Sequence, residues 1–308
     1  MDLVSVIIPT YNGSKIIERA INSVITQSYE NIEIIVVDDN GKDTEEQINT
    51  QNIISSYDDS RIRYIAHKYN RNGSAARNTG VSIARGRYIA LLDDDDEFLP
   101  DKIRLQVEVI SNKDDNYALC YTSYINYFEE GRQRIIYAEK EGDLCLELLK
   151  LKISLLSSIL LIKRDVWLEL GGFDEALKRD QDLEFCTRVL FKYKAVFVPE
   201  ICMKRYVLKR NIASHVSKGV EYRFIYLEKS KDIINSYNKT EKRDIYFAHY
   251  TELAKRYLRR RHYFEALKLI IYSKKPMSSS IKLVRDYFIY KKSFRDNNEE
   301  LFWHSNQE

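Results

Sequence analysis

The sequence predicts an α/β fold: a mostly parallel, Rossmann-like central sheet flanked by helices, followed by a helical C-terminal region. Three observations predict it. Short apolar runs rich in Val and Ile alternate with segments of helical periodicity over residues 3–210. Polar residues follow the early apolar runs, at the edge where open α/β sheets bind their ligands. After residue 217 the strand patterns fade, and apolar residues recur at helical spacing.

The first three elements predict a βαβ unit. Residues 3–8 are a β-branched run that ends at Pro9, and residues 16–25 repeat Ile, Ala and Val at helical spacing. Residues 32–37 form a second apolar run, which ends in an acidic pair. Strand, helix and strand in this order place the ends of two parallel strands at one edge of a sheet.

The alternation continues along the chain. We expect further strands at 61–66, 88–92, 117–127, 134–137, 157–162, 195–198 and 201–208. We expect further helices at 43–57, 75–84, 100–110, 144–151, 165–170 and 182–192. In the C-terminal region we expect helical segments near 220–236, 240–260, 263–273 and 278–292.

Five acids in a row follow the apolar run 88–92. They are Asp93, Asp94, Asp95, Asp96 and Glu97. Carboxylates this crowded repel one another and raise one another's pKa unless a cation neutralises them. A hard divalent ion, Mg²⁺ or Mn²⁺, prefers such oxygen ligands. The alternative is a solvated acidic turn that follows a strand.

Composition and charge describe a globular protein with two differently charged regions. The chain is 44% hydrophobic and 31% charged, and its net charge is +3. Residues 1–217 hold 29 Lys and Arg against 34 Asp and Glu, whereas residues 218–308 hold 20 against 12. The four cysteines form no CxxC pair, which indicates buried thiols in a reducing compartment. No signal sequence opens the chain and no apolar run is long enough to span a bilayer, so we expect a cytoplasmic protein.

Four motifs fall in order along the chain: three follow expected strands, and the one at 77–80 lies on the helix before the acidic run. They are Pro9-Thr10-Tyr11-Asn12, Asp38-Asp39, Arg77-Asn78-Thr79-Gly80 and Asp93-Asp94-Asp95. Together they closely resemble the family-2 glycosyltransferases, which have the nucleotide-sugar-binding GT-A fold, and the resemblance covers roughly residues 3–210. It implies an inverting, metal-dependent transferase that uses a nucleotide-sugar, with UDP as the expected nucleotide.

The resemblance implies a donor site built from three loops. Backbone groups of Pro9, Thr10, Tyr11 and Asn12 would line the base, with Tyr11 in position to stack on it. Asp38 or Asp39 would accept hydrogen bonds from the base or ribose, although Asp38-Asp39-Asn40-Gly41 is also a good turn sequence. Arg77 would approach the pyrophosphate, or it would form a structural ion pair with an acid of the 93–97 run. Asp93 and Asp94 complete the donor-site set.

The metal site implied by the resemblance is the Asp-X-Asp element. Asp95 would be the direct ligand of Mn²⁺ or Mg²⁺, and Asp93 would hold the ribose or a metal-bound water. His215 is a third candidate, as a late metal or phosphate ligand; a lone histidine is more often structural or solvated. Asp96 and Glu97 would lie behind these ligands or in solvent.

A second landmark supplies the candidate general base. In the resembling family a Gly-Gly-Phe-Asp segment, here 171–174, precedes an acidic pair at the start of a helix, here Gln181-Asp182. A carboxylate there would deprotonate the acceptor hydroxyl as it attacks the anomeric carbon. Asp180 is the fallback base. The structural alternative is that Asp180 or Asp182 only caps the helix.

These features predict a catalytic domain over 1–217, with a nucleotide-binding half at 1–98 and an acceptor-binding half at 99–217. The chain lacks the Gln-x-x-Arg-Trp element of processive synthases, so transfer of one sugar to a glycan, lipid-linked or glycoprotein acceptor is expected. The alternatives are a nucleotidyltransferase that makes nucleotide-sugars and a non-catalytic nucleotide- or carbohydrate-binding module. A nucleotidyltransferase would need a Gly-rich, basic loop after the first strand, which is absent.

The basic helical region, 218–308, carries no recognised nucleic-acid motif, and we expect no nucleic-acid partner. Its cations suit an anionic acceptor at a membrane, on the inner face, because basic amphipathic surfaces are attracted to anionic leaflets. Self-association into a homo-oligomer is an equal alternative, since Tyr and Arg are enriched at interfaces. The third alternative is a solvated appendage.

Overall fold

The structure is a computed structural model, and it describes residues 1–207 and 216–273. The chain divides into two compact units. The first comprises residues 1–145 and 155–214, and the second comprises residues 146–154 and 215–308. The expected helix at 278–292 and the candidate ligand His215 lie outside the described residues.

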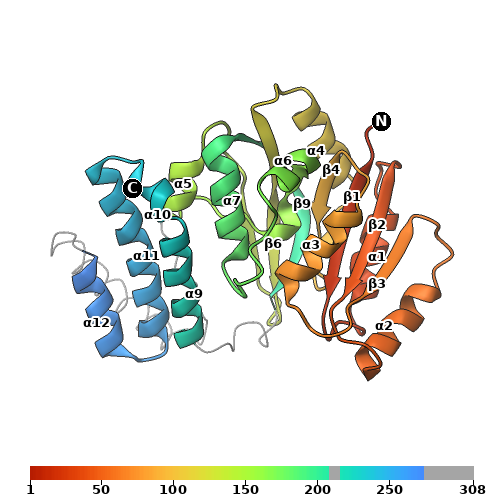
Figure 1. Ribbon diagram of the computed structural model, residues 1–308, viewed down its shortest axis with the longest axis horizontal. Coiled ribbons are helices and arrows are strands. Elements are labelled where there is room, and N and C mark those ends of the chain that lie inside the picture. Colours follow the sequence, from red (N-terminus) through yellow and green to blue (C-terminus); the bar gives the residue numbers. More distant parts are fainter. Residues whose placement is uncertain (208–215, 274–308) are drawn as a thin grey trace. The chain divides into compact units, whose positions relative to one another are not determined.

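The first unit is built on one nine-stranded sheet with the order β3-β2-β1-β4-β8-β6-β9-β5, and β7 pairs with β6 (Figure 1). Strands β1, β2, β3 and β4 are parallel, and β8 joins them to the second half of the sheet in antiparallel fashion. The strands are β1 (Val4–Thr10), β2 (Ile32–Asp38), β3 (Ile62–Ala66), β4 (Tyr88–Leu91), β5 (Glu97–Phe98), β6 (Tyr117–Phe128), β7 (Gln133–Ile136), β8 (Leu161–Lys163) and β9 (Lys194–Val207).

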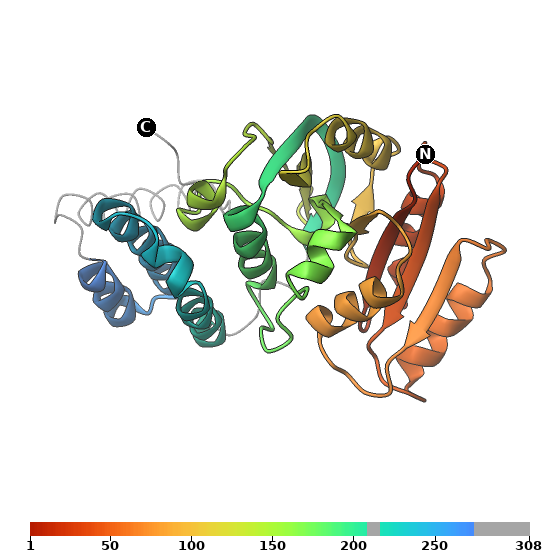
Figure 2. The same ribbon diagram turned by 45° about the horizontal axis from the view of Figure 1, so that its top comes forward.

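Helices cover the sheet (Figures 1 and 2). Helix α3 packs on β1 and β2, α1 packs on β1 and β5, and α4 packs on β6 and β9. The helices of this unit are α1 (Ile17–Ile25), α2 (Glu45–Ser55), α3 (Gly73–Ile83), α4 (Lys102–Ser111), α6 (Arg164–Glu169) and α7 (Gln181–Lys192), with a 3₁₀ turn at Ser157–Ile159. The predicted class, α/β with a mostly parallel sheet flanked by helices, is confirmed.

The central strands are buried because neighbours cover them on both sides. Every residue of β1, β2 and β4 is buried. Strand β1 continues through Pro9 to Thr10, two residues past the predicted end. Pairing of β1 with β4 stops at Ile7 opposite Leu91, so the missing N–H of Pro9 removes no hydrogen bond on that side.

Three predicted strands differ from the structure. The stretch predicted as one strand at 157–162 begins as a 3₁₀ turn, and only Leu161–Lys163 pairs with β4 and β6. The two strands predicted at 195–198 and 201–208 are one strand, β9, whose register against β6 shifts between Val198 and Ile201. Pro199 cannot donate a ladder hydrogen bond, so the strand bulges there instead of ending.

The second unit is helical. It contains α9 (Val216–Lys229), α10 (Lys231–Asn235), α11 (Lys239–Arg259) and α12 (Tyr263–Tyr272), together with most of α5 (Cys145–Leu149). His249 of α11 is fully buried and its Nε2 lies 2.9 Å from the carbonyl oxygen of Leu149. Lys150 pairs with Asp244 at 3.7 Å. The segment 146–154 therefore packs with the C-terminal helices, although the sequence placed it in the catalytic domain. No helix in the described parts of the chain is long and apolar enough to cross a membrane.

Candidate active site

The parallel strands bring the predicted motifs to one edge of the sheet. In the register of β1 and β2, Thr10 lies opposite Asp38, and the Asp39 N–H donates to the Thr10 carbonyl at 2.9 Å. The chain leaving β4 stays beside β1, because the Leu92 N–H donates to the Ile7 carbonyl at 3.0 Å. The loops after β1, β2 and β4 therefore meet where the sequence predicted the ligand site.

The acidic run after β4 folds into a tight turn. The Asp96 N–H donates to the Asp93 carbonyl at 3.0 Å, which closes the turn and brings its two ends together. Asp93, Asp95 and Asp96 each offer a carboxylate oxygen within 4.8 Å of the others. The sequence predicted Asp93 and Asp95 for this cluster and placed Asp96 behind them. The structure makes Asp96 the third member.

Electrostatics show that the cluster is crowded. Burial, followed by the charges of Asp93 and Asp95, raises the pKa of Asp96 well above its ordinary value. The Ser158 hydroxyl donates to Asp96 at 2.7 Å and opposes this shift only in part. Three converging carboxylates are the donor set that Mn²⁺ and Mg²⁺ prefer, so the residues present fit a divalent cation.

Asp94 points away from this cluster. Its carboxylate accepts a hydrogen bond from the Thr10 hydroxyl at 2.6 Å and another from the backbone of Tyr11. Gly13 lies against it: a Cβ there would be 2.1 Å from the Asp94 carboxylate. Burial raises the pKa of Asp94 to about 6. Asp94 thus joins the loop after β1 to the acidic turn.

Asp38 and Asp39, the predicted base or ribose ligands, are buried among donors of the chain itself. Asp38 accepts from the Asn40 N–H and from the Tyr64 hydroxyl, both at 2.8 Å, and burial raises its pKa. Asp39 accepts from the Arg71 and Asn72 N–H groups, both at 2.8 Å. Asp39 therefore fixes the loop that leads into α3.

Several residues near this pair were missed by the sequence analysis. His67 Nδ1 lies 2.7 Å from Asp39 and Nε2 lies 2.9 Å from the Thr79 hydroxyl, so the ring bridges β3 and α3. Asn40 accepts from the Asn12 N–H at 2.7 Å, and its buried Nδ2 has no hydrogen-bond partner in the described chain. Asn12 has the left-handed φ of 53°, which asparagine tolerates. The Asn40 amide is a free donor beside the predicted base-binding loop.

Arg77 lies between the acidic turn and Asp182, the predicted general base. It is buried on α3, and its guanidinium forms an ion pair with Asp93. Burial opposes its charge, but the charges of Asp93 and Asp182 outweigh this and raise the pKa of Arg77. Its Nε and one Nη have no hydrogen-bond partner among the described residues. Of the two alternatives for Arg77, the structural ion pair is present. Two of its guanidinium nitrogens remain without a partner among the described residues and can donate to a ligand.

Asp182 stands at the second position of α7 and does not cap the helix. Its two carboxylate oxygens accept from the Ser157 hydroxyl at 2.6 Å and from the Ser157 N–H at 3.2 Å. Burial raises its pKa, and the nearby charge of Arg77 acts in the opposite direction. Asp180 precedes the helix with a left-handed φ of 56° and makes no capping hydrogen bond. Ser157 is a partner that sequence reasoning did not find.

The Gly-Gly-Phe-Asp segment holds α7 against α3. Gly171 and Gly172 have φ values of 74° and 68°, and a Cβ on Gly172 would lie 2.5 Å from Asn78. Asn78 accepts from the Phe173 N–H at 2.9 Å and donates to the Phe173 carbonyl at 2.8 Å. Asn78 thereby joins two motifs about a hundred residues apart, and it places Asp182 on the same side as Arg77 and Asp93.

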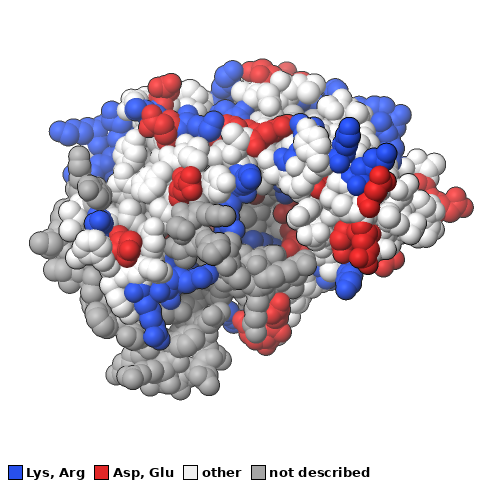
Figure 3. Space-filling model, turned by 60° about the horizontal axis from the view of Figure 1, so that its bottom comes forward, with Lys and Arg blue, Asp and Glu red and all other residues white. Residues whose placement is uncertain are grey.

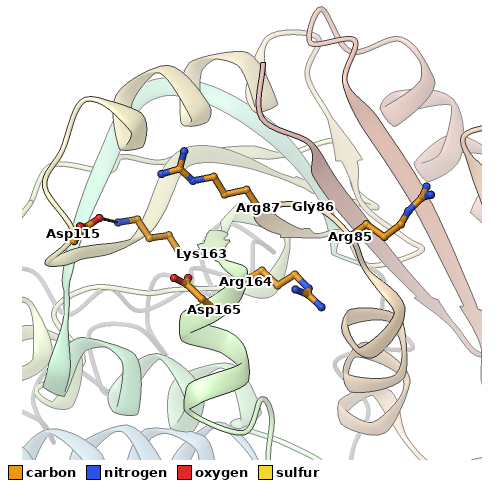
Figure 4. A pocket seen from close by; sticks show the side chains of 7 residues that line it. All are labelled: Arg85, Gly86, Arg87, Asp115, Lys163, Arg164 and Asp165. Atoms are coloured by element: carbon orange, nitrogen blue, oxygen red, sulfur yellow. Dashed lines mark hydrogen bonds and ion pairs between the residues drawn. The ribbon is translucent and has the colours of Figure 1, made fainter.

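A separate cavity of about 340 Å³ lies at the opposite edge of the sheet, where β4 begins (Figure 4). Its lining is rich in Arg and Lys. Arg87 pairs with Asp2 at 3.0 Å, Arg85 with Glu33 at 3.1 Å and Lys163 with Asp115 at 3.3 Å. Most of its cations are thus already neutralised, and the cavity has no part in the site built around Asp93.

Comparison with known proteins agrees with the class that this fold and site define. Residues 5–169 match the profile of Glycosyl transferase family 2. The chain belongs to this family, as the motifs predicted.

The curated relatives differ in how much of the chain they share. An uncharacterized glycosyltransferase of Rickettsia felis is 39% identical over 197 residues, which are 61% of this chain and 31% of that protein. The Escherichia coli protein WfaP, a UDP-Glc:alpha-D-GlcNAc-diphosphoundecaprenol beta-1,3-glucosyltransferase, is 39% identical over 130 residues, 42% of this chain and 48% of WfaP. The amylovoran biosynthesis glycosyltransferase AmsB of Erwinia amylovora is 26% identical over 95% of this chain and 93% of AmsB.

Solved structures share the fold at low identity. A fragment of S. aureus TarS, residues 1–349, in complex with UDP-GlcNAc aligns with a TM-score of 0.62 at 17% identity. The alignment covers 83% of this chain and 72% of that fragment. The mannosyltransferase PcManGT of Pyrobaculum calidifontis, in complex with GDP-Man and Mn²⁺, aligns with a TM-score of 0.63 at 16% identity. The alignment covers 96% of this chain and 82% of PcManGT. These similarities show the fold of the chain.

Proposed function

We propose that the chain transfers one sugar from a UDP-linked donor to a hydroxyl of a lipid-linked or other glycan acceptor, with inversion at the anomeric carbon. The observation that carries the proposal is the arrangement around Arg77. The charges of both Asp93, a member of the cluster Asp93, Asp95 and Asp96, and Asp182 act on this one guanidinium, so the cluster and Asp182 lie at the same edge of the sheet. The name of the relative WfaP, which gives UDP-Glc as donor and a diphosphoundecaprenol acceptor, supports this choice.

The donor would lie along the edge formed by the loops after β1, β2 and β4. Tyr11 is exposed and available to stack on the base, and the free amide of Asn40 can donate to a base carbonyl. The unpartnered N–H groups of Arg77 can donate to a phosphate oxygen. Asp38 and Asp39 would act through the loops that they fix, since their oxygens already accept hydrogen bonds from within the chain.

Asp93, Asp95 and Asp96 would hold a Mn²⁺ or Mg²⁺ ion with the diphosphate. When bound, such an ion stabilises the negative charge that develops on the leaving nucleoside diphosphate. Arg77 adds positive charge from the protein side and holds Asp93 in position.

Asp182 would serve as the general base. Its carboxylate takes the proton of the acceptor hydroxyl while the oxygen forms a bond to the anomeric carbon. The bond from that carbon to the phosphate oxygen breaks, and the electron pair leaves with the diphosphate. Ser157 holds the carboxylate with two hydrogen bonds, and the raised pKa makes Asp182 a better proton acceptor than an exposed aspartate.

The test uses the full chain with a panel of UDP- and GDP-sugars, in Mn²⁺ and in excess chelator. We expect Mn²⁺-dependent hydrolysis or transfer with a UDP-sugar, and thermal stabilisation by that donor. Asp182→Asn should keep the stabilisation and lose turnover. Nucleotide-sugar binding or turnover that is equal in Mn²⁺ and in chelator would contradict the requirement for a metal. Turnover by Asp182→Asn at the wild-type rate would contradict the role of Asp182 as general base.

A further inference from the structure

Helix α12 of the helical unit is apolar on two faces. One face packs within the unit, where Ala266 and Leu269 are buried against Leu253, Ala254 and Leu258 of α11. This contact holds α11 and α12 together as an antiparallel pair joined by the turn at 260–262. It accounts for the inner face of α12 and leaves the outer face to be explained.

The outer face exposes large apolar side chains. Phe264 is 66% exposed, Leu267 is 53% exposed and Ile271 is 68% exposed. Their spacing of three and four residues puts them on one stripe of the helix, and Tyr263 lies beside it with 48% exposure. Single exposed apolar residues need no explanation, but a continuous stripe on one short helix marks an interaction surface.

Positive charge surrounds this stripe. The end of α11 and the following turn carry Arg259, Arg260 and Arg261, all exposed. Lys268 is also exposed, and its ammonium group lies 4.4 Å from the centre of the Phe264 ring. In the stretch 253–273, Lys and Arg number six, whereas Glu265 is the single acid. On the face of the molecule shown in Figure 3, basic and acidic side chains are both present and interspersed.

We propose that α12 lies in the surface of an anionic lipid bilayer, with Phe264, Leu267 and Ile271 entering the acyl boundary. Arg259, Arg260 and Arg261 would then contact the head groups. A ten-residue helix is too short to span a bilayer, but an apolar stripe flanked by cations is the pattern of an interfacial helix. The proposal does not depend on which sugar donor is used, and it brings the enzyme to the surface where lipid-linked acceptors reside.

Charge favours the bilayer over a second copy of the chain. A symmetric contact through this stripe with the two helices parallel would bring the arginines of both copies together, and like charges across an interface are unfavourable. With the helices antiparallel, the arginines would lie at opposite ends of the contact and would gain no acidic partner from α12, whose single acid is Glu265. An anionic leaflet supplies opposite charge instead. Each arginine close to such a surface strengthens binding about five-fold, so the three together contribute on the order of 100-fold.

The experiment is flotation of the full chain with vesicles of phosphatidylcholine alone or mixed with phosphatidylglycerol. We expect flotation with the mixed vesicles only, and weaker flotation at high salt. The variant R259Q/R260Q/R261Q should bind the mixed vesicles on the order of 100-fold more weakly. The variant F264S/L267S/I271S should lose flotation, whereas F191S, at an apolar residue of α7 that is 48% exposed, should float like the wild type.

A second measurement places the helix at the membrane. In F264W, the new indole should emit at shorter wavelength with the mixed vesicles and be quenched by brominated lipid chains. Circular dichroism melts should show that the variants remain folded, because the buried face of α12 is unchanged. The proposal is overturned if the wild type does not float, if F264S/L267S/I271S floats equally well, or if sedimentation without lipid shows a dimer that this variant converts to monomer.

Discussion

Two aspartate runs lie at the ends of β2 and β4, the parallel strands on either side of β1, yet their surroundings differ. Asp38 and Asp39 are buried after β2, and backbone N–H groups and Tyr64 donate to their oxygens. Asp93, Asp95 and Asp96 after β4 converge instead, and the pKa of Asp96 is strongly raised. A buried carboxylate needs donors or a cation, and the hydrogen bond from Ser158 offsets only part of the rise in the pKa of Asp96. The first run therefore positions loops, and the second is suited to hold a metal.

The largest expected effect comes from the acid that faces the second run. Asp182→Asn removes the proton acceptor but keeps the shape of the side chain and one oxygen for the Ser157 hydroxyl. We expect kcat to fall by about two to four orders of magnitude, with little change in donor affinity. Single-turnover rates and donor titrations measure the two quantities separately.

The matched control is Asp180→Asn, two residues earlier at the start of α7. We expect it to keep most of the activity. If Asp180→Asn loses turnover and Asp182→Asn does not, the general base is Asp180.

The next effect separates the two runs by stability. Asp39→Ala would leave the buried N–H groups of Arg71 and Asn72 and the ring of His67 without their acceptor. We expect the free energy of unfolding to fall by about 3 kcal/mol. Asp95→Ala removes one of three repelling charges, and without metal it should change stability by less than about 1 kcal/mol. Urea denaturation in chelator compares the free energies of unfolding of the two variants. Equal losses of stability would contradict the distinction between a structural and a metal-binding run.

The same rule about buried charge gives a pH prediction at Lys102. This residue of α4 is fully buried with one neutral partner, Gln106 at 2.7 Å, and burial lowers its pKa to about 7. The unfolded state then binds more protons than the folded state between about pH 7 and 10.5, so stability rises with pH across that window. The neighbouring thiols stay neutral there, because burial raises the pKa of Cys120 to about 12 and that of Cys202 to about 11.

Lys102→Met should remove this dependence. We expect the variant to be more stable than the wild type at pH 7 by a few kcal/mol, with the difference shrinking toward pH 10. Thermal melts of both proteins across this range measure it. A wild-type stability that stays flat or falls over the same window would contradict the assignment of the slope to Lys102.

The smallest expected effect concerns Asp94, the acid of the 93–97 run that accepts hydrogen bonds from the loop after β1. Thr10→Val removes the hydroxyl that donates to Asp94 at 2.6 Å, and it should cost about 1 kcal/mol of stability. Thr10→Ser keeps the hydroxyl and serves as the control. Denaturation at pH 7.5 tests this pair, and equal stability of the two variants would show that the hydrogen bond contributes little.

The sequence predicted the strands and the acids because apolar runs and turn residues are local signals. These local signals predict where β2 and β4 end, and therefore where both aspartate runs lie. The sequence did not predict that Asp96 would join Asp93 and Asp95, or that Asp94 would accept a hydrogen bond from Thr10. That outcome depends on the turn closed by Asp96 and Asp93, which brings Asp93, Asp95 and Asp96 together and directs Asp94 toward Thr10.

Other features required contacts far apart in the chain. Ser157 binds Asp182 from a stretch predicted as a plain strand, and His67 reaches Asp39 from the end of β3. A lone serine or histidine carries no local signal for such a role. The segment 146–154 likewise shows no sequence feature that assigns it to the C-terminal helices, because its contacts with Asp244 and His249 are tertiary.

The most direct test of the distinction between the two runs is calorimetric titration of UDP into the full chain, with Mn²⁺ and with excess chelator. The account predicts that wild-type protein binds UDP in Mn²⁺, that chelator abolishes or strongly weakens this binding, and that Asp95→Ala in Mn²⁺ behaves like the wild type in chelator. Asp39→Asn, measured at a temperature where it is folded, should still respond to Mn²⁺. UDP binding of the same affinity in Mn²⁺ and in chelator would contradict the assignment of the Asp93, Asp95 and Asp96 cluster as the metal site.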